Sequence, residues 1–260
     1  MRSLWTGAIG FGLVNIPVKL FSATESSNLD LDMLDKKDHS HIKYMRVNEK
    51  TGKEVKWENI VKGYMVGNKY VVLDETDFEA ASAVKTKTIT ITDFVAEKEI
   101  DTMYYETPYY LEPDKSGERA YVLLREALQK TGKVGVSTFV MRNKEAPAIL
   151  RASGDLIILN RLRFAEEIRD SKGLKIPSRT SVKPTELKMA VSLINQSTGK
   201  FNIKKYKDTY NAELMKLIKK KSKGVKIATP HLKVVHNKTK DLMEQLKASL
   251  GTTTKKKKAS

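Results

Sequence analysis

Short segments rich in Val, Ile, Thr and Tyr recur through the first 160 residues and constrain the fold of this chain most strongly. β-branched and aromatic residues favour strands, and the segment 86–95 alternates cleanly through Ile89 and Ile91. A single helical stripe interrupts the series. Many short strands with one embedded helix favour a closed barrel over alternating β-α units. We therefore expect a mainly β fold, with strands at 3–21, 70–73, 86–95, 103–111, 134–142, 148–151 and 156–160.

The embedded helix has start and stop signals of its own. Ser116 is the expected N-cap, and Gly132 suits the C-terminal cap, where a left-handed residue ends many helices. Between them lies an apolar stripe at helical spacing that predicts the buried face. Its members are Ala120, Leu123, Leu124, Ala127 and Leu128.

Glycines interrupt the first strand region. Gly7, Gly10 and Gly12 have the order G-x-x-G-x-G and precede a strand, so they do not match a dinucleotide-binding fingerprint. Glycine within a strand pattern indicates a bulge or bend, as at a barrel corner.

Charge divides the chain into two parts. Residues 1–165 hold 24 Lys and Arg against 23 Asp and Glu, whereas residues 166–260 hold 24 against 8, a net of +16. A near-neutral body with a basic trailing part is typical of a folded platform that grips a polyanion. Nucleic acid is the first candidate, because lysine-rich surfaces release condensed counterions from phosphates.

The body is itself polarised. The turn-rich insert 36–69 carries a net charge of +5, and the span 71–114 carries −8. We expect the insert to face a nucleic acid and the acidic span to face away from it. The expected phosphate contacts in the insert are Lys36, Lys37, Lys43, Arg46, Lys50, Lys53, Lys56 and Lys62. Arg2 and Lys19 at the barrel entrance and the terminal run Lys255, Lys256, Lys257 and Lys258 complete the expected set.

Beyond residue 165 the pattern becomes helical. Apolar residues at helical spacing predict helices at 185–196, 206–220 and about 237–250. The run Lys219–Lys223 is read either as a charged helix end or as a DNA contact. The third helix follows a linker at 224–230, and its apolar stripe either packs back on the body or docks into a partner's groove, which we favour. The stripe comprises Leu242, Met243, Leu246 and Leu250.

Catalytic and metal-binding patterns are weak. The chain has no cysteine, which excludes disulfides and thiolate metal sites and fits a reducing cytoplasm. His39 and His41 lack a distal pair for zinc, so we expect no metal and no cofactor. The cluster Asp30, Asp32, Asp35 and Asp38 does not match a calcium loop and is read as a solvated acidic loop, with a two-metal nuclease as the alternative. No apolar run reaches membrane-spanning length, so we expect no insertion into a membrane. No catalytic constellation stands out in the sequence, so we expect a protein that is not an enzyme, located in the cytoplasm and associated with the nucleoid.

Four separated motifs in order resemble the bacterial Ku proteins of non-homologous end joining. They are RSLWTGAIGFGLVNIPVKLF near the start, KGYMVGNKYVVL, YYLEPDKSGERAYVLLREAL and the closing DLMEQLKASL. The resemblance covers the chain from Arg2 to about Leu250. Many relatives carry cysteines in the segment equivalent to 39–52, where this chain reads HSHIKYMRVNEKTG, so zinc is not expected here.

The resemblance implies a division of the chain. Residues 1–165 would form the Ku core β-barrel with its DNA-facing insert at about 36–69. Residues 166–223 would form a helical dimerisation arm, 224–250 a ligase-interacting region and 251–260 a disordered basic tail. The homodimer would enclose double-stranded DNA ends in a ring and recruit the ATP-dependent DNA ligase D.

The residues and the resemblance lead to one main hypothesis. A ring that slides onto any end contacts phosphates, which position a protein without specifying sequence. We therefore expect a scaffold that binds double-stranded DNA ends for double-strand break repair. The alternatives are a general basic protein that coats DNA or RNA and, less well supported, a nuclease that uses Asp30, Asp32 and Asp35.

Overall fold

The computed structural model describes residues 1–81, 87–141, 144–178, 182–225 and 246. The chain divides into two compact units. One comprises residues 1–26 and 30–170, and the other comprises residues 27–29 and 171–260.

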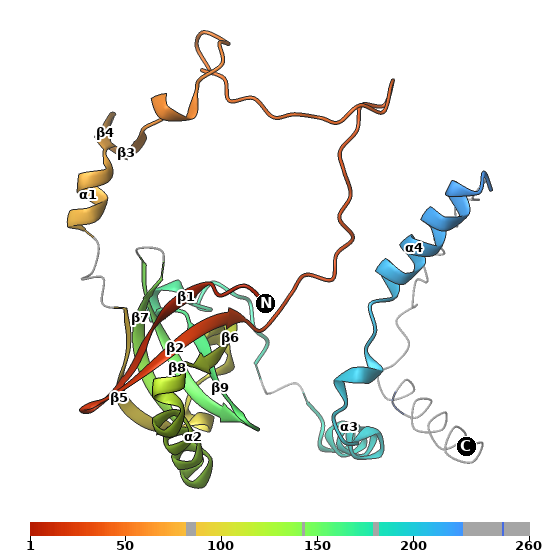
Figure 1. Cartoon of the computed structure of the whole chain (residues 1–260). Helices are drawn as coiled ribbons and strands as arrows, with labels where there is room; N and C mark the ends of the chain where they lie inside the picture. Colours follow the sequence, from red (N-terminus) through yellow and green to blue (C-terminus); the bar gives the residue numbers. More distant parts are fainter. Residues whose placement is uncertain (82–86, 142–143, 179–181, 226–245, 247–260) are drawn as a thin grey trace. The chain divides into compact units, whose positions relative to one another are not determined.

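The first unit is built on a closed barrel of seven strands in the order β1-β2-β6-β9-β8-β7-β5 (Figure 1). All neighbouring strands are antiparallel except β1 and β5, which run parallel and close the barrel. Closure leaves no sheet edge for another chain to pair with. The strands are β1 (Trp5–Phe11), β2 (Val14–Ser22), β5 (Thr88–Ala96), β6 (Tyr105–Pro113), β7 (Lys133–Met141), β8 (Lys144–Ser153) and β9 (Leu156–Leu162).

Alternation along the strands produces the core. In β2, Ile16, Val18 and Leu20 are fully buried, while the residues between them are partly exposed. In β9, Ile157 and Leu159 continue the same inner layer. Because successive side chains point to opposite faces of a strand, this pattern places one apolar row inside the barrel. The mainly β barrel expected from the sequence is therefore confirmed.

The first strand is regular, which corrects the expectation of glycine bulges there. β1 pairs with β2 without a register shift from Trp5 to Phe11. A side chain at Gly7 would collide with the carbonyl of Lys87, so this glycine allows close backbone approach. Gly12 has a φ of +55° and forms the turn between β1 and β2. The register shifts lie instead in β5 and β6.

Helix α2 (Glu118–Thr131) is the expected embedded helix, and it packs against β2, β7 and β8. Gly132 ends it with a φ of +63°, as expected. The start differs from the expectation: a short 3-10 turn, η4 (Lys115–Gly117), precedes the helix, and Gly117 rather than Ser116 is the N-cap.

The predicted buried stripe of α2 is wrong at two positions. Tyr121, Leu124 and Leu128 are buried against the barrel, whereas Leu123 is 68 % exposed and Ala127 is also exposed. Tyr121 has a reason to face inward, because its hydroxyl donates a 2.7 Å hydrogen bond to the carbonyl of Leu111 and accepts one of 2.6 Å from the N–H of Ile157. This hydroxyl therefore links β6 and β9 where their pairing ends.

A long segment between β2 and β5 carries only short elements. Its two-stranded sheet, β3 (Lys62–Val66) with β4 (Lys69–Leu73), is closed by a turn in which Gly67 has a φ of +59°. The strand at 70–73 was expected, and β3 was not. Further short elements of this unit are η1 (Trp57–Asn59), α1 (Glu75–Ala80), η2 (Glu97–Glu99), η3 (Thr102–Tyr104) and η5 (Ala165–Glu167).

The second unit contains two described helices, α3 (Pro184–Ser197) and α4 (Thr209–Ser222), joined through η7 (Ile203–Lys205). Both helices were expected. Asp208 caps α4 by accepting a 3.0 Å hydrogen bond from the N–H of Asn211. The side chain of Asn211 donates to the carbonyl of Ser27 at 2.9 Å, which ties residues 27–29 to this unit.

Candidate nucleic-acid interface

The basic insert, residues 36–69, is exposed except at Val55, which is partly exposed. No residue from Thr24 to Ala81 is buried, and all eight of its predicted phosphate contacts are exposed. A segment that buries nothing of its own depends on local hydrogen bonds, or on a binding partner, for a defined shape. The structure shows how such bonds order this one.

The first ordered element is a turn at residues 35–40. The backbone N–H of Asp35 donates to the carbonyl of Ser40 at 2.8 Å, and the N–H of His39 donates to the carbonyl of Asp35 at 2.9 Å. The carboxylate of Asp35 accepts a 2.7 Å hydrogen bond from the N–H of Lys37, which is the typical Asx turn. Lys36 and Lys37 thus lie at the tip of a closed turn.

The second element is a turn at residues 48–53 with the same bonding. The N–H of Asn48 donates to the carbonyl of Lys53 at 2.9 Å, and the N–H of Gly52 donates to the carbonyl of Asn48 at 2.8 Å. The side chain of Asn48 accepts from the N–H groups of Lys50 and Thr51. This turn carries Lys50 and Lys53, and the first turn carries Lys36 and Lys37.

The two turns form a structural repeat that the sequence did not reveal. The bridge between Leu34 and His41 flanks the first turn, and its counterpart 13 residues later, between Val47 and Glu54, flanks the second. The residue with positive φ is His39 in the first turn, at +59°, and Gly52 in the second, at +64°. Within the repeat, Lys37 and Lys50 occupy equivalent positions, and each donates its backbone N–H to the side chain that opens its turn. An Asp or Asn at the start of each turn was the available sequence signal.

Aromatic rings support two further cations of the insert. The guanidinium of Arg46 lies 4.6 Å from the centroid of the Trp57 ring, and the ammonium of Lys62 lies 4.8 Å from that of Phe78. Such contacts hold a cation by the ring's quadrupole without neutralising it. Trp57 is 72 % exposed and was not singled out from the sequence. Trp57 and Phe78 are therefore two residues of this surface that sequence reasoning missed.

The cations of the insert and those at the barrel entrance differ in ion pairing. Among the described residues, no ion pair joins any of the insert's eight predicted cations to a carboxylate. Lys19, by contrast, pairs with Asp114 at 3.0 Å, and the hydrogen bond to that carboxylate raises the pKa of the Lys19 ammonium. Arg2 is exposed. The charge of the insert is therefore the more available to phosphate.

Several predicted site residues fall outside the described part of the chain. The terminal run Lys255–Lys258 is one such group. Leu242, Met243 and Leu250 are others, and Leu246 alone of the apolar stripe is described. Their DNA-binding and partner-binding roles stay predictions.

The acidic cluster carries no organised metal site in the described ranges. Asp35 and Asp38 hold local turns, the latter by accepting from the N–H of Ser40 at 2.9 Å, which lowers the pKa of Asp38. Across the described residues, no group of three or more His, Asp or Glu side chains is arranged to hold a metal ion. The described helices also include none that is long and apolar enough to cross a membrane.

Comparison with known proteins decides the family. The family model described as the Ku70/Ku80 beta-barrel domain matches residues 10–189, which include the barrel strands β2 to β9 and the end of β1. The chain belongs to the Ku family. The match covers the insert as well as the barrel, so the expected resemblance is confirmed for both.

Curated Ku proteins are similar over most of this chain, and all three named here are called non-homologous end joining protein Ku. The protein of Cupriavidus necator is 42 % identical over 226 residues, covering 85 % of this chain and 67 % of its own. That of Bacillus subtilis is 38 % identical, covering 97 % and 83 %. That of Coxiella burnetii is 37 % identical, covering 99 % and 97 %.

Proposed function

We propose that this Ku chain is a non-enzymatic scaffold that binds double-stranded DNA ends without sequence specificity, and that bridges and protects them for repair of double-strand breaks. The observation that carries the proposal is the basic insert, in which exposed lysines sit on ordered turns without ion-paired carboxylates. Family membership supports the same role, because the curated relatives are named for end joining.

Phosphate contact is the binding mode that this surface suits. Lysines at the tips of two turns offer point charges, which recognise phosphate by charge rather than by base identity. Each phosphate that is neutralised releases counterions, so affinity falls steeply as salt rises. Binding of this kind accepts an end of any sequence.

A second copy of the chain is the partner that we propose for the insert and the helical arm. The insert exposes large apolar side chains, and the isolated β3–β4 hairpin is of a size that is marginally stable in water by itself. The helices α3 and α4 also expose apolar residues, among them Leu187 and Ile194. A symmetric homodimer would cover these surfaces and present the basic insert twice, on opposite sides of a duplex.

We assign recruitment of the ATP-dependent ligase D to residues 224–250, with Leu242, Met243, Leu246 and Leu250 as the contact stripe. An apolar helix face that follows a linker suits docking into a partner's groove. Replacing Leu242 and Leu246 by Asp is expected to abolish stimulation of the ligase and to leave end binding unchanged. Loss of dimerisation in this variant would show instead that the stripe packs on the Ku body.

The insert is tested by reversing the charge of its two turns. In the full chain, the four substitutions Lys36→Glu, Lys37→Glu, Lys50→Glu and Lys53→Glu are expected to weaken binding to a linear duplex at least tenfold. They should also make the dependence of affinity on salt shallower, because fewer phosphates are neutralised. The matched control reverses four exposed lysines outside the insert: Lys98, Lys115, Lys130 and Lys144. Equal losses in the two variants would mean that only net charge matters, and would overturn the proposed role of the turns.

A further inference from the structure

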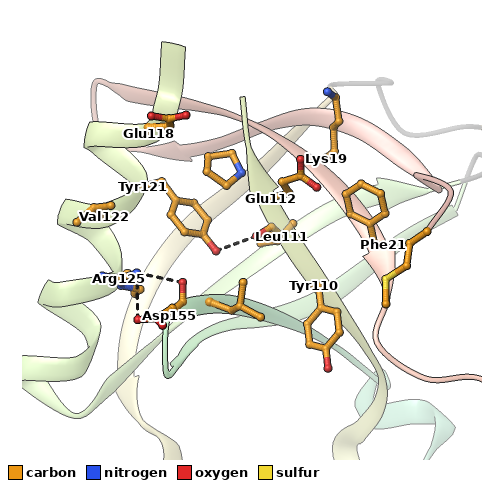
Figure 2. Close-up of a pocket in the computed structure, with 13 residues that line it drawn as sticks. Lys19, Phe21, Tyr110, Leu111, Glu112, Glu118, Tyr121, Val122, Arg125 and Asp155 are labelled. Atoms are coloured by element: carbon orange, nitrogen blue, oxygen red, sulfur yellow. Dashed lines mark hydrogen bonds and ion pairs between the residues drawn. The ribbon is translucent and has the colours of Figure 1, made fainter. Parts of the chain in front are cut away.

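A groove of about 880 Å³ lies on the outside of the barrel, between α2, the strands β2 and β6, and the turn that joins β8 to β9 (Figure 2). It is separate in sequence from the basic insert. Every residue that lines it belongs to the barrel unit.

The floor of the groove is rigid. Tyr121 reaches from α2 to the barrel and is only 3 % exposed, and its hydroxyl holds the carbonyl of Leu111 and the N–H of Ile157. Figure 2 shows the hydrogen bond that joins Tyr121 to Leu111. A floor fixed by hydrogen bonds costs a ligand little ordering when it binds.

Two aromatic rings line the side formed by the strands. Phe21 of β2 and Tyr110 of β6 are register partners, and both are half-buried. Their neighbours Leu20 and Leu111 point into the core, so the alternation of strands directs Phe21 and Tyr110 to the outer face. The pair gives the groove an apolar wall with exposed π faces.

The charge of the groove is negative, opposite to that of the chain as a whole. Lys19 and Arg125 line it, but Lys19 pairs with Asp114 at 3.0 Å and Arg125 pairs with Glu126 at 2.7 Å. The lining adds the carboxylates of Glu112, Glu118 and Asp155, the last of which lies 3.9 Å from Arg125, and the terminal ammonium of Met1. With the ion-pair partners Asp114 and Glu126 included, five carboxylates stand against three cations, and this net negative field repels phosphate and attracts cations.

We propose that this groove binds a peptide segment of a partner protein in which Lys or Arg side chains flank a large apolar side chain. Carboxylates and aromatic faces together attract ammonium and guanidinium groups, and the apolar side chain fills the space above Tyr121. Since the groove repels DNA, it stays available while DNA occupies the basic insert. This interaction is independent of the proposed binding of DNA ends, and the test below contains no DNA in its first step.

The test uses a defined probe and the full-length protein. A fluorescein-labelled peptide KLKFKG is titrated by fluorescence anisotropy, beside ELEFEG with reversed charge and KSKSKG without apolar side chains. Wild-type protein is expected to bind KLKFKG at least tenfold more tightly than either control peptide. The double substitution Glu112→Lys with Glu118→Lys is expected to weaken binding of KLKFKG at least tenfold. The matched control, Glu99→Lys with Glu145→Lys, changes exposed carboxylates elsewhere on the barrel and should change it less than twofold.

A charge-neutral variant guards against a folding artefact. Tyr110→Ser is expected to weaken binding of KLKFKG at least threefold while thermal unfolding shows a folded barrel.

Equal binding of KLKFKG by the two double variants, or equal binding of KSKSKG and KLKFKG by wild type, would overturn the proposal and leave only non-specific attraction. A change in oligomeric state in the groove variants would overturn it in favour of a contact between copies. A loss of affinity for linear DNA in those variants would contradict it as well, because it would make the groove a nucleic-acid site.

Discussion

The guanidinium of Arg46 lies 4.6 Å from the ring centroid of Trp57. Arg46 precedes the second lysine turn, and Trp57 begins η1, which follows that turn. The contact links two sides of an element that has no buried core. It holds a cation in place and leaves its charge unpaired, which is the state that phosphate binding requires.

Removing the ring should therefore weaken DNA binding without unfolding the protein. Trp57→Ala is expected to lower affinity for a linear duplex about two- to fivefold, in line with roughly 0.5–1 kcal/mol for an exposed cation–π contact. Gel-shift titration at fixed salt measures the change. Tyr44→Ala, which removes another exposed ring of the same insert, is the control. An equal loss in both variants would mean that the stacking on Arg46 is not what matters.

The hydroxyl of Tyr121 is expected to contribute strongly to barrel stability. Tyr121→Phe leaves the carbonyl of Leu111 and the N–H of Ile157 without their shared partner, and an unsatisfied buried group costs about 1–3 kcal/mol. We expect the free energy of unfolding to fall by roughly 2–4 kcal/mol in urea titrations. Tyr110→Phe serves as the control, and its effect should stay within about 0.5 kcal/mol, as for surface changes in general. A neutral Tyr121→Phe would show that water replaces the hydroxyl.

The contribution of the Tyr121 hydroxyl to stability should also depend on pH in alkaline solution. Burial raises the pKa of Tyr121 above its ordinary value of 10.0. A raised folded-state pKa means that this stabilisation is fully present below about pH 10 and is lost as the pH rises toward the folded-state pKa. The melting temperature of wild type should thus fall more steeply above pH 10 than that of Tyr121→Phe. Parallel curves for the two proteins would show that Tyr121 ionises equally in the folded and unfolded states.

The terminal lysines give a prediction about salt. Deleting residues 251–260 removes Lys255, Lys256, Lys257 and Lys258, and should lower affinity for linear DNA while leaving the proposed dimer intact. The slope of log affinity against log salt should become shallower by up to about 3–4, or roughly 0.9 for each lost phosphate contact. Sedimentation measures the oligomeric state, and gel shifts at several salt concentrations measure the slope of log affinity against log salt. An unchanged slope would remove the tail from the DNA-binding surface.

The barrel was predictable because each strand buries one face. Residues such as Ile89 and Val18 alternate with exposed or partly exposed neighbours, and this leaves a period of two in the sequence. β3 was missed for the opposite reason: all five of its residues are exposed, and Gly63 interrupts its apolar pattern. The start of α2 was predicted at the wrong residue because Ser116 belongs to the 3-10 turn η4, and such turns have no strong sequence pattern.

The candidate site was predictable in composition and not in geometry. The excess of lysines identified the insert, but the 13-residue repeat of its turns involves unlike residues, Asp35 with Asn48 and His39 with Gly52. Backbone hydrogen bonds create that similarity, so residue identities do not show it. Likewise, no helical or strand period relates Arg46 to Trp57, because the chain between them turns back on itself.

The binding of DNA ends is tested most directly by comparing a linear duplex of about 40 base pairs with a covalently closed minicircle of similar sequence. Both are titrated with the full-length protein in gel shifts at two salt concentrations. A ring that threads onto an end predicts strong binding to the linear duplex, little binding to the minicircle and weaker binding at higher salt. Equal affinity for the two forms would contradict this account and would make the chain a basic protein that grips the side of DNA.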